Sequence, residues 1–269
     1  MSLTLPRRRH ALRLAILGVA GLVLATLVPA QSATPAEAGS ATYSLSRQTY
    51  PDGRSVVARW NPCQKVVTYK VNTIHSAKTK SGRAKALRDV KGAFSRLSAA
   101  TGIKFRYTGA SKLIPKSTSS STWQARQKHA EIYVAWVKQS KSSSRTNLLG
   151  RSGRGWAAGS GGYAYKFWRV GDDPWKGAIG RGFVVLDGGQ NSKFKAGFGK
   201  GTTRGDLLLH ELGHVMGLNH VGSQSQVMYP TIKKRTASTY RAGDRAGLAR
   251  LGRSAGCLSV PGWVWKDLS

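Results

Sequence analysis

Apolar residues with strand or helix periodicity divide much of the chain into predicted elements. Short β-branched and aromatic runs predict strands, and they lie at residues 65–71, 103–107, 132–137 and 183–187. Between the first two runs, apolar residues recur at spacings of three and four, which predicts an amphipathic helix that stops at Gly102. These residues are Leu87, Val90, Phe94 and Leu97. A leucine-rich pattern predicts a second helix over 206–216, and the order of elements predicts a mixed α/β (α+β) fold.

Polar stretches of low complexity separate these elements. Residues 117–122 and the Gly/Ser/Arg-rich residues 142–162 predict loops. Residues 31–60 begin with a composition of Ser, Thr, Ala and Pro, which predicts a flexible mature N-terminus. We therefore expect one folded domain over 61–269 and a monomer.

The first 30 residues have the pattern of an export signal. An apolar stretch at 14–28 is shorter than the about 20 residues that span a bilayer as a helix. Small residues at 28–30 and 36–38 suit signal peptidase, and we expect cleavage after Ala30. An uncleaved membrane anchor is the alternative, and the basic residues leave a twin-arginine route open. These residues are Arg7, Arg8, Arg9 and Arg13. We expect a secreted protein without stable membrane insertion.

Two cysteines remain after the predicted cleavage. Cys63 and Cys257 stand near opposite ends of the mature chain, and an oxidising compartment would allow them to pair. Two unpaired structural cysteines are the alternative. A disulfide would close a loop of nearly the whole domain.

The charge is strongly unbalanced. The chain has 43 Lys+Arg against 11 Asp+Glu, a formal net charge of +32, and the cations are spread over the mature chain. One interpretation is a solvated surface without a partner; the others are retention on anionic cell-wall polymers and steering of acidic substrates. No motif indicates specific nucleic-acid binding.

One motif carries chemistry. Residues 210–220 read HELGHVMGLNH, a long zinc-binding signature. Residues four apart on a helix lie on the same face, so His210 and His214 can bind one metal. Gly217 permits the left-handed turn that ends the helix and returns His220 to that metal.

The ligand set predicts a catalytic metal centre. Three histidine nitrogens leave the fourth position of a tetrahedral zinc open for water, with Glu211 beside it as the general base. A structural histidine cluster or a zinc store is the alternative, but a structural site normally has a fourth protein ligand.

The chain resembles the metzincin clan of zinc proteases, and within it the matrixin branch. Residues 226–230, QVMYP, are similar to the methionine-containing turn that lies beneath the metal in this clan, with Met228 as its support. Tyr229 directly follows Met228, as in matrixins, so the resemblance does not make it a metal ligand. The similarity extends over about 63–252, and its last part, a closing helix, rests on Asp244, Gly247, Leu248 and Leu251.

The resemblance implies further features and some departures. It places Gly162, Tyr163 and Ala164 on an edge strand that pairs with an extended polypeptide substrate. Val221 stands where matrixins usually have a small hydroxyl residue. The histidines of a second, structural zinc site are missing, so we expect one zinc ion. Calcium is an option that we do not expect, and its candidate ligands are Asp172, Asp173 and Asp187.

The prediction that follows is a secreted zinc endopeptidase that cleaves extended polypeptides with one catalytic zinc. A cationic surface-binding protein that holds zinc without turnover and a hydrolase of cell-wall amides are the rivals. The absence of a cysteine-containing prosegment leaves Cys63 as an alternative cap of the zinc, in competition with its pairing to Cys257.

Overall fold

The computed structural model describes residues 42–49, 53–116, 130–152, 155–172 and 174–262. Its helices are α1 (Lys80–Thr101), α3 (Arg204–Met216) and α4 (Ala242–Leu251), and its 3-10 turns are η1 (Ser142–Ser144), η2 (Asn191–Lys193) and η3 (Arg253–Ala255). Its strands are β1 (Gln48–Thr49), β2 (Ser55–Val56), β3 (Ala58–Arg59), β4 (Val67–Asn72), β5 (Phe105–Ala110), β6 (Ile132–Val137), β7 (Arg151–Ser152), β8 (Gly155–Trp156), β9 (Gly159–Trp168) and β10 (Lys176–Asp187). The predicted export signal at 1–30 and the predicted loop at 117–122 lie outside the described residues. Among the described helices, none is long and apolar enough to cross a membrane.

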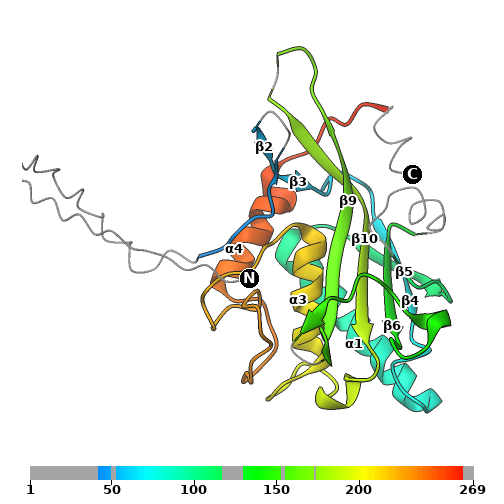
Figure 1. Cartoon of the computed structure of the whole chain (residues 1–269). Helices are drawn as coiled ribbons and strands as arrows, with labels where there is room; N and C mark the ends of the chain where they lie inside the picture. Colours follow the sequence, from blue (N-terminus) through cyan, green and yellow to red (C-terminus); the bar gives the residue numbers. More distant parts are fainter. Residues whose placement is uncertain (1–41, 50–52, 117–129, 153–154, 173, 263–269) are drawn as a thin grey trace, which may run out of the picture. The chain divides into compact units, whose positions relative to one another are not determined.

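A six-stranded mixed sheet forms the centre of the domain (Figure 1). Strand β10 pairs on one side with β9 and on the other with β6 and β3, and β4 and β5 follow β6. All pairs are parallel except β9 with β10, which is antiparallel. The predicted α/β fold is confirmed, and β9 is an edge strand of the sheet.

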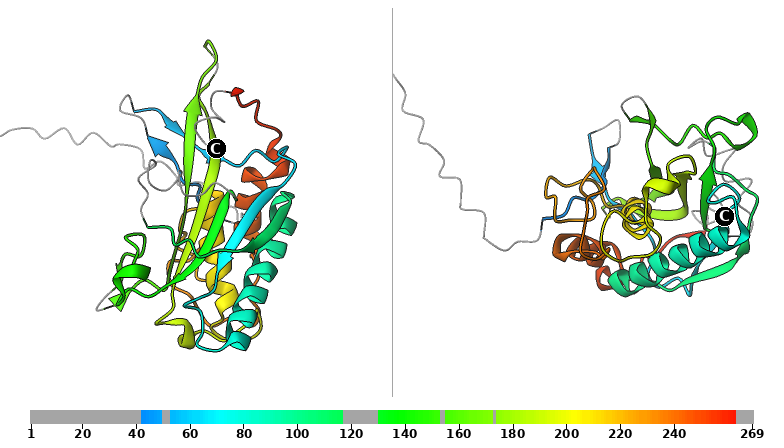
Figure 2. Two further views of the ribbon diagram at one scale, coloured as in Figure 1. Left: turned by 90° about the vertical axis from the view of Figure 1, so that its right-hand side faces the viewer. Right: turned by 90° about the horizontal axis from the view of Figure 1, so that it is seen from below.

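Two helices pack side by side on one face of the sheet (Figure 2). Helix α1 begins at the N-cap Thr79, whose side chain accepts a hydrogen bond from Gly82 N–H, and ends at Gly102 with φ 71°. Its buried stripe includes Phe94, whose ring stacks on that of Tyr69 at 3.7 Å. The apolar spacing in the sequence predicted this helix correctly because that stripe faces the sheet. Helix α3 packs on β9 and β10 and carries the zinc-binding motif.

The loop predicted over 142–162 is wrong at its C-terminal end. Strand β9 begins at Gly159, and β7 and β8 pair just before it. Glycine and serine have low strand propensity. Here the backbone pairing with β10 and a close approach to α3, which side chains would block, outweigh that preference.

The folded domain also includes part of the stretch expected to be flexible, residues 31–60. Strand β3 pairs with β10, and the next residue, Trp60, is fully buried and donates a hydrogen bond to Val215 O at 2.9 Å. Leu45 forms an isolated antiparallel bridge with Leu218. Single apolar residues in a polar stretch leave no periodic signal, so these contacts could not be predicted from the pattern.

Cys63 and Cys257 form the expected disulfide, with a Cα–Cα distance of 5.3 Å. The bond joins the chain after β3 to the segment after η3, where Asn61 also exchanges two hydrogen bonds with Leu258. The disulfide excludes both the unpaired cysteines and a Cys63 cap on the metal.

Replacing both cysteines by alanine should lower the free energy of unfolding by about 2–5 kcal/mol, because the reduced chain gains conformational freedom when unfolded. Since hydrogen bonds hold the same two segments together, we expect activity at 25 °C to persist. Denaturant titration beside a peptidase assay measures both. Unchanged stability would contradict the role given to the bond.

Candidate active site

Helix α3 presents the histidines of the motif. The Thr203 side chain caps its first turn by accepting a hydrogen bond from Asp206 N–H, and the helix is buried except at His214, which is half-buried. Its C-cap is Gly217, with φ 102°, and the Gly217 N–H donates to the carbonyls of Gly213 and His214. This turn reverses the chain, as the left-handed conformation of glycine allows.

Residues 44–46, near the start of the described chain, form hydrogen bonds with residues 217–219, which follow the turn at Gly217. Ser46 N–H donates to Gly217 O and Asn219 N–H donates to Ser44 O, both at 2.8 Å. These bonds flank the bridge between Leu45 and Leu218 and fix the residues just before His220. The placement of His220 therefore depends on residues far away in the sequence.

The three histidine side chains converge on one point. Their Nε2 atoms are 3.2 Å apart between His210 and His220, 3.3 Å between His210 and His214, and 3.1 Å between His214 and His220. Nitrogens about 2.0–2.1 Å from a tetrahedral zinc lie about 3.4 Å from one another, so the spacing fits this ion. Among the described residues, these three form the group of His, Cys, Asp and Glu side chains that could hold a metal.

The tautomers agree with metal binding. His210 Nδ1 lies 2.8 Å from Val227 O, and His214 Nδ1 lies 2.9 Å from Leu218 O. A carbonyl can only accept, so both Nδ1 atoms donate and both Nε2 atoms keep a lone pair toward the other rings. A cation between them removes the repulsion of these lone pairs.

The three histidines are uncharged at neutral pH. Burial lowers the pKa of His210 to about 3 and that of His214 to about 4, and the neighbouring imidazoles lower both further. Burial also lowers the pKa of His220, which is the most exposed of the three. Neutral imidazole is the form that binds a metal.

Glu211 lies in the wall of the cleft beside these histidines. The cleft has a volume of about 950 Å³, and its walls include Gly159 and Gly161 of β9 and, opposite, Pro230 and Ile232. Burial raises the pKa of the Glu211 carboxyl to about 8, and a hydrogen bond from the Gly161 backbone opposes that rise. The carboxyl can therefore hold a proton near neutral pH, as proton transfer requires.

Two glycines let β9 lie against this glutamate. A Cβ atom at Gly161 would overlap the backbone carbonyl of Glu211, and one at Gly159 would lie 2.6 Å from its Oε1. In an antiparallel pair, the backbone N–H and C=O groups of successive residues point alternately toward and away from the partner strand. Asp187 N–H donates to Ala158 O, so the backbone groups of Gly159, Gly161 and Tyr163 point away from β10, to the free edge of β9. The predicted substrate residues Gly162, Tyr163 and Ala164 lie on this edge strand, but the sequence did not single out Gly161, which is the residue in contact with Glu211.

The turn around Met228 lies under the helix. A Cβ atom at Gly213 would overlap Met228 Sδ, so the glycine allows the thioether to pack against α3. The N–H groups of Val227 and Met228 donate to the carboxylate of Asp244 on α4, at 2.8 and 3.2 Å. Val221 N–H donates to Met228 O at 3.1 Å, which ties the residue after His220 to the same turn.

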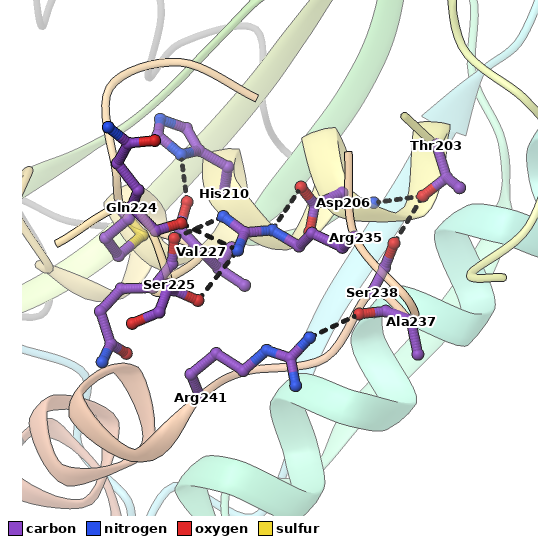
Figure 3. A network of polar contacts seen from close by, with 12 residues as sticks. Thr203, Asp206, His210, Gln224, Ser225, Val227, Arg235, Ala237, Ser238 and Arg241 are labelled. Atoms are coloured by element: carbon purple, nitrogen blue, oxygen red, sulfur yellow. Dashed lines mark hydrogen bonds and ion pairs between the residues drawn. The ribbon is translucent and has the colours of Figure 1, made fainter. Parts of the chain in front are cut away.

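The buried side chain of Arg235 stabilises the turn around Met228 through hydrogen bonds and an ion pair (Figure 3). Arg235 donates through Nε to Asp206 at 3.0 Å and through its two terminal nitrogens to the carbonyls of Gln224, Ser225 and Gln226. Burial raises the pKa of Asp206, and the guanidinium opposes that rise. Asp206 lies one turn before His210 on α3, so Arg235 joins the turn to the helix that it supports. Nothing in the sequence singled out either residue, because the pair forms only in the folded chain.

The other predicted residues are not brought together at this site. Asp172 precedes β10 and Asp187 ends it, so the length of a 12-residue strand separates two calcium candidates, and Asp173 lies outside the described residues. The Asp187 carboxylate accepts hydrogen bonds from Gly189 and Gln190. Tyr229 is half-buried, with the Lys233 ammonium 4.9 Å from its ring centre. The calcium candidates therefore do not form one site.

Gly161→Ala should lower kcat by about tenfold to a hundredfold, because its methyl group forces β9 away from Glu211 and small displacements at a reacting centre are costly. Gly150→Ala is the matched control, since a methyl group there meets no atom within 4 Å. Steady-state kinetics on one peptide compares the two. Equal activity of both variants would show that the contact is not needed.

Arg235→Leu should lower the free energy of unfolding by about 3–5 kcal/mol, because it leaves the Asp206 carboxylate buried without its partner. Lys234→Leu, at an exposed neighbouring position, should change it by about 0.5 kcal/mol or less. Denaturant titration of both variants is the measurement. Similar losses in the two would contradict a special role of Arg235.

Comparison with known proteins agrees with the geometry. A family model described as matrixin, peptidase family M10, matches residues 59–251, which include the three histidines, Glu211 and the Met228 turn. No curated protein matches the chain. The match covers most of the chain, and the family implies a catalytic zinc, which the converging histidine nitrogens fit. The chain therefore belongs to the matrixin family and is a zinc metalloendopeptidase.

Proposed function

We propose that this matrixin is exported and hydrolyses extended polypeptides with Glu211 as the general base. Its zinc ligands are His210, His214 and His220, and the observation that carries this assignment is the convergence of their Nε2 atoms at 3.1–3.3 Å. Zinc, when bound, acidifies a water molecule and polarises the scissile carbonyl. The chain's own residues supply the rest of the reaction.

Glu211 moves the proton. Its carboxylate takes a proton from the attacking water and then delivers it to the nitrogen of the leaving amine. Burial favours the protonated form of this carboxyl, and the Gly161 N–H favours the ionised form, so neither state is strongly preferred. That balance suits a group that must accept a proton and release it in the same turnover.

The substrate lies along β9. Gly159, Gly161 and Tyr163 direct backbone groups to the free edge of the sheet, and an extended peptide can add there as a further strand. Recognition through main-chain hydrogen bonds requires an unfolded or loop segment. We therefore assign flexible segments of proteins as the substrates.

Two observations support export. The apolar residues 14–28 follow a basic head, as in a signal peptide. The domain also carries a disulfide, a bond that persists in oxidising compartments.

The excess of cations supports retention on anionic cell-wall polymers. Of the carboxylates in the described residues, only that of Asp172 is exposed; the others are buried or half-buried. The described surface therefore has few carboxylates that could pair with the excess Lys and Arg side chains of a chain with a net charge of +32. The anionic groups of a polymer would pair with these side chains instead.

Glu211→Gln should lower kcat by about 10²–10⁴-fold while one zinc per chain is retained, because the amide keeps the shape of the side chain and cannot accept the proton. Asp172→Asn, at the exposed carboxylate, is the control and should keep full activity. Cleavage of a peptide library with and without a zinc chelator, beside metal analysis, gives the readouts. Turnover by Glu211→Gln at the rate of the parent would refute its role as base.

A further inference from the structure

The outward face of α1 is a row of cations. Helix positions that repeat at about 100° per residue place four basic side chains within a sector of about 140°. All four are exposed, and together they are called the α1 ridge: Lys80, Lys85, Arg88 and Lys91. The other residues of that sector are small: Ser81, Ala84, Gly92, Ser95, Ser98 and Ala99. No bulky side chain of α1 itself therefore stands between the charges, and the Phe198 ring lies against Gly92 beyond Lys91.

The ridge has no counter-charge within the described chain. The acidic residue of α1, Asp89, is buried and bonded to Arg204 and to Gly197 N–H. The first turn of the helix has no acidic residue. None of the four ridge cations takes part in an ion pair among the described residues. The ridge is therefore a stripe of positive charge without a carboxylate partner, and one of its cations, Lys91, lies over the Tyr107 ring with its ammonium 4.5 Å from the ring centre.

This arrangement works against the helix itself. Lys85, Arg88 and Lys91 are spaced three residues apart, where like charges repel, and Lys80 lies at the helix end that favours negative charge. Packing of the buried stripe on the sheet must offset both effects. A bound polyanion would neutralise the repulsion between these side chains. The charges that destabilise the free helix therefore favour binding of the polymer.

We propose that the α1 ridge binds a flexible, linear phosphate polymer. The four cations lie on the twelve helical residues 80–91 and extend along about 16 Å, which suits a linear chain with repeated charges. None of the ridge residues is aromatic or apolar, and the two rings beside them, Tyr107 and Phe198, are half-buried, so no exposed ring offers a base a stacking face. This inference rests on the retention part of the proposed function and gives that retention a surface.

A polymer on the ridge leaves the active site open. None of the residues that line the cleft belongs to α1, and the ridge is on the face of α1 opposite the stripe that packs on the sheet. The protease would then be held by one face while the cleft remains accessible to peptides.

The test compares two triple variants of equal charge. The ridge variant is Lys85→Gln, Arg88→Gln and Lys91→Gln; the dispersed control is Lys65→Gln, Lys138→Gln and Lys234→Gln, at three exposed positions in separate parts of the domain. Binding of long-chain inorganic polyphosphate is measured against salt concentration. For the ridge variant we expect at least tenfold weaker binding at about 150 mM salt and a log–log salt slope smaller by about 2, since three phosphate contacts are lost. The control should lose less than about threefold.

Two further readouts separate this surface from the rest of the molecule. Without polymer, the ridge variant should melt at the same or a higher temperature than the parent, because the repulsion that is removed outweighs the lost contact of Lys91 with the Tyr107 ring. Peptide hydrolysis should be the same for parent and both variants, with or without polyphosphate. Inhibition by polyphosphate that persists when zinc is kept in excess of the chelating capacity of the polymer would place the polymer in the cleft and overturn the inference.

The remaining outcomes are distinct. Equal losses in the two variants would overturn the α1 ridge and leave retention by overall charge intact. Failure of the parent to bind polyphosphate at about 150 mM salt would overturn both the ridge and the proposed retention, without touching the peptidase function. Tighter binding of duplex DNA than of polyphosphate at equal phosphate concentration would overturn the assignment to a flexible polymer.

Discussion

The active site depends on holding three imidazole nitrogens toward one point without letting the rings separate. In the described structure the Nε2 atoms lie 3.1–3.3 Å apart, and two of the rings are oriented by carbonyls that accept from Nδ1. The Nε2 lone pairs of His210 and His214 repel at their separation of 3.3 Å, so the surrounding chain must maintain the arrangement. The turn at Gly217, the turn around Met228 and the N-terminal segment meet this requirement from three sides.

The turn around Met228 is itself clamped by buried charges. Asp244 accepts hydrogen bonds from the N–H groups of Val227 and Met228. Arg235 donates to the three carbonyls of residues 224–226, which lead into the turn, so the turn is held through its backbone. Asp206 brings the same arginine onto α3, one helical turn before His210. Because the carbonyl of Val227 belongs to this turn, the orientation of His210 depends on groups that never touch the metal.

Acidic and basic side chains occupy different parts of the described domain. Carboxylates serve the interior: Asp89 joins α1 to the start of α3, Asp206 and Asp244 support the Met228 turn, and Glu211 faces the cleft. Cations cover the outside, where few carboxylates meet them. Most acidic residues in the described part of the chain thus lie in the interior or at the cleft, as the proposed retention on polyanions would require.

Local patterns determined a large part of the outcome. The spacing of HELGHVMGLNH implies the helical histidine pair and the glycine turn, since these follow from helix geometry and from the freedom of glycine at positive φ. The apolar periodicity of α1 and the β-branched runs of β4, β6 and β10 likewise reflect one buried face or a buried strand. Tertiary structure alone decided that Gly159 and Gly161 form a strand against Glu211, that Arg235 pairs with Asp206, and that Leu45 bridges the segment before His220. These features join residues far apart in the chain, and a contact of that kind leaves no periodic trace in either partner's sequence.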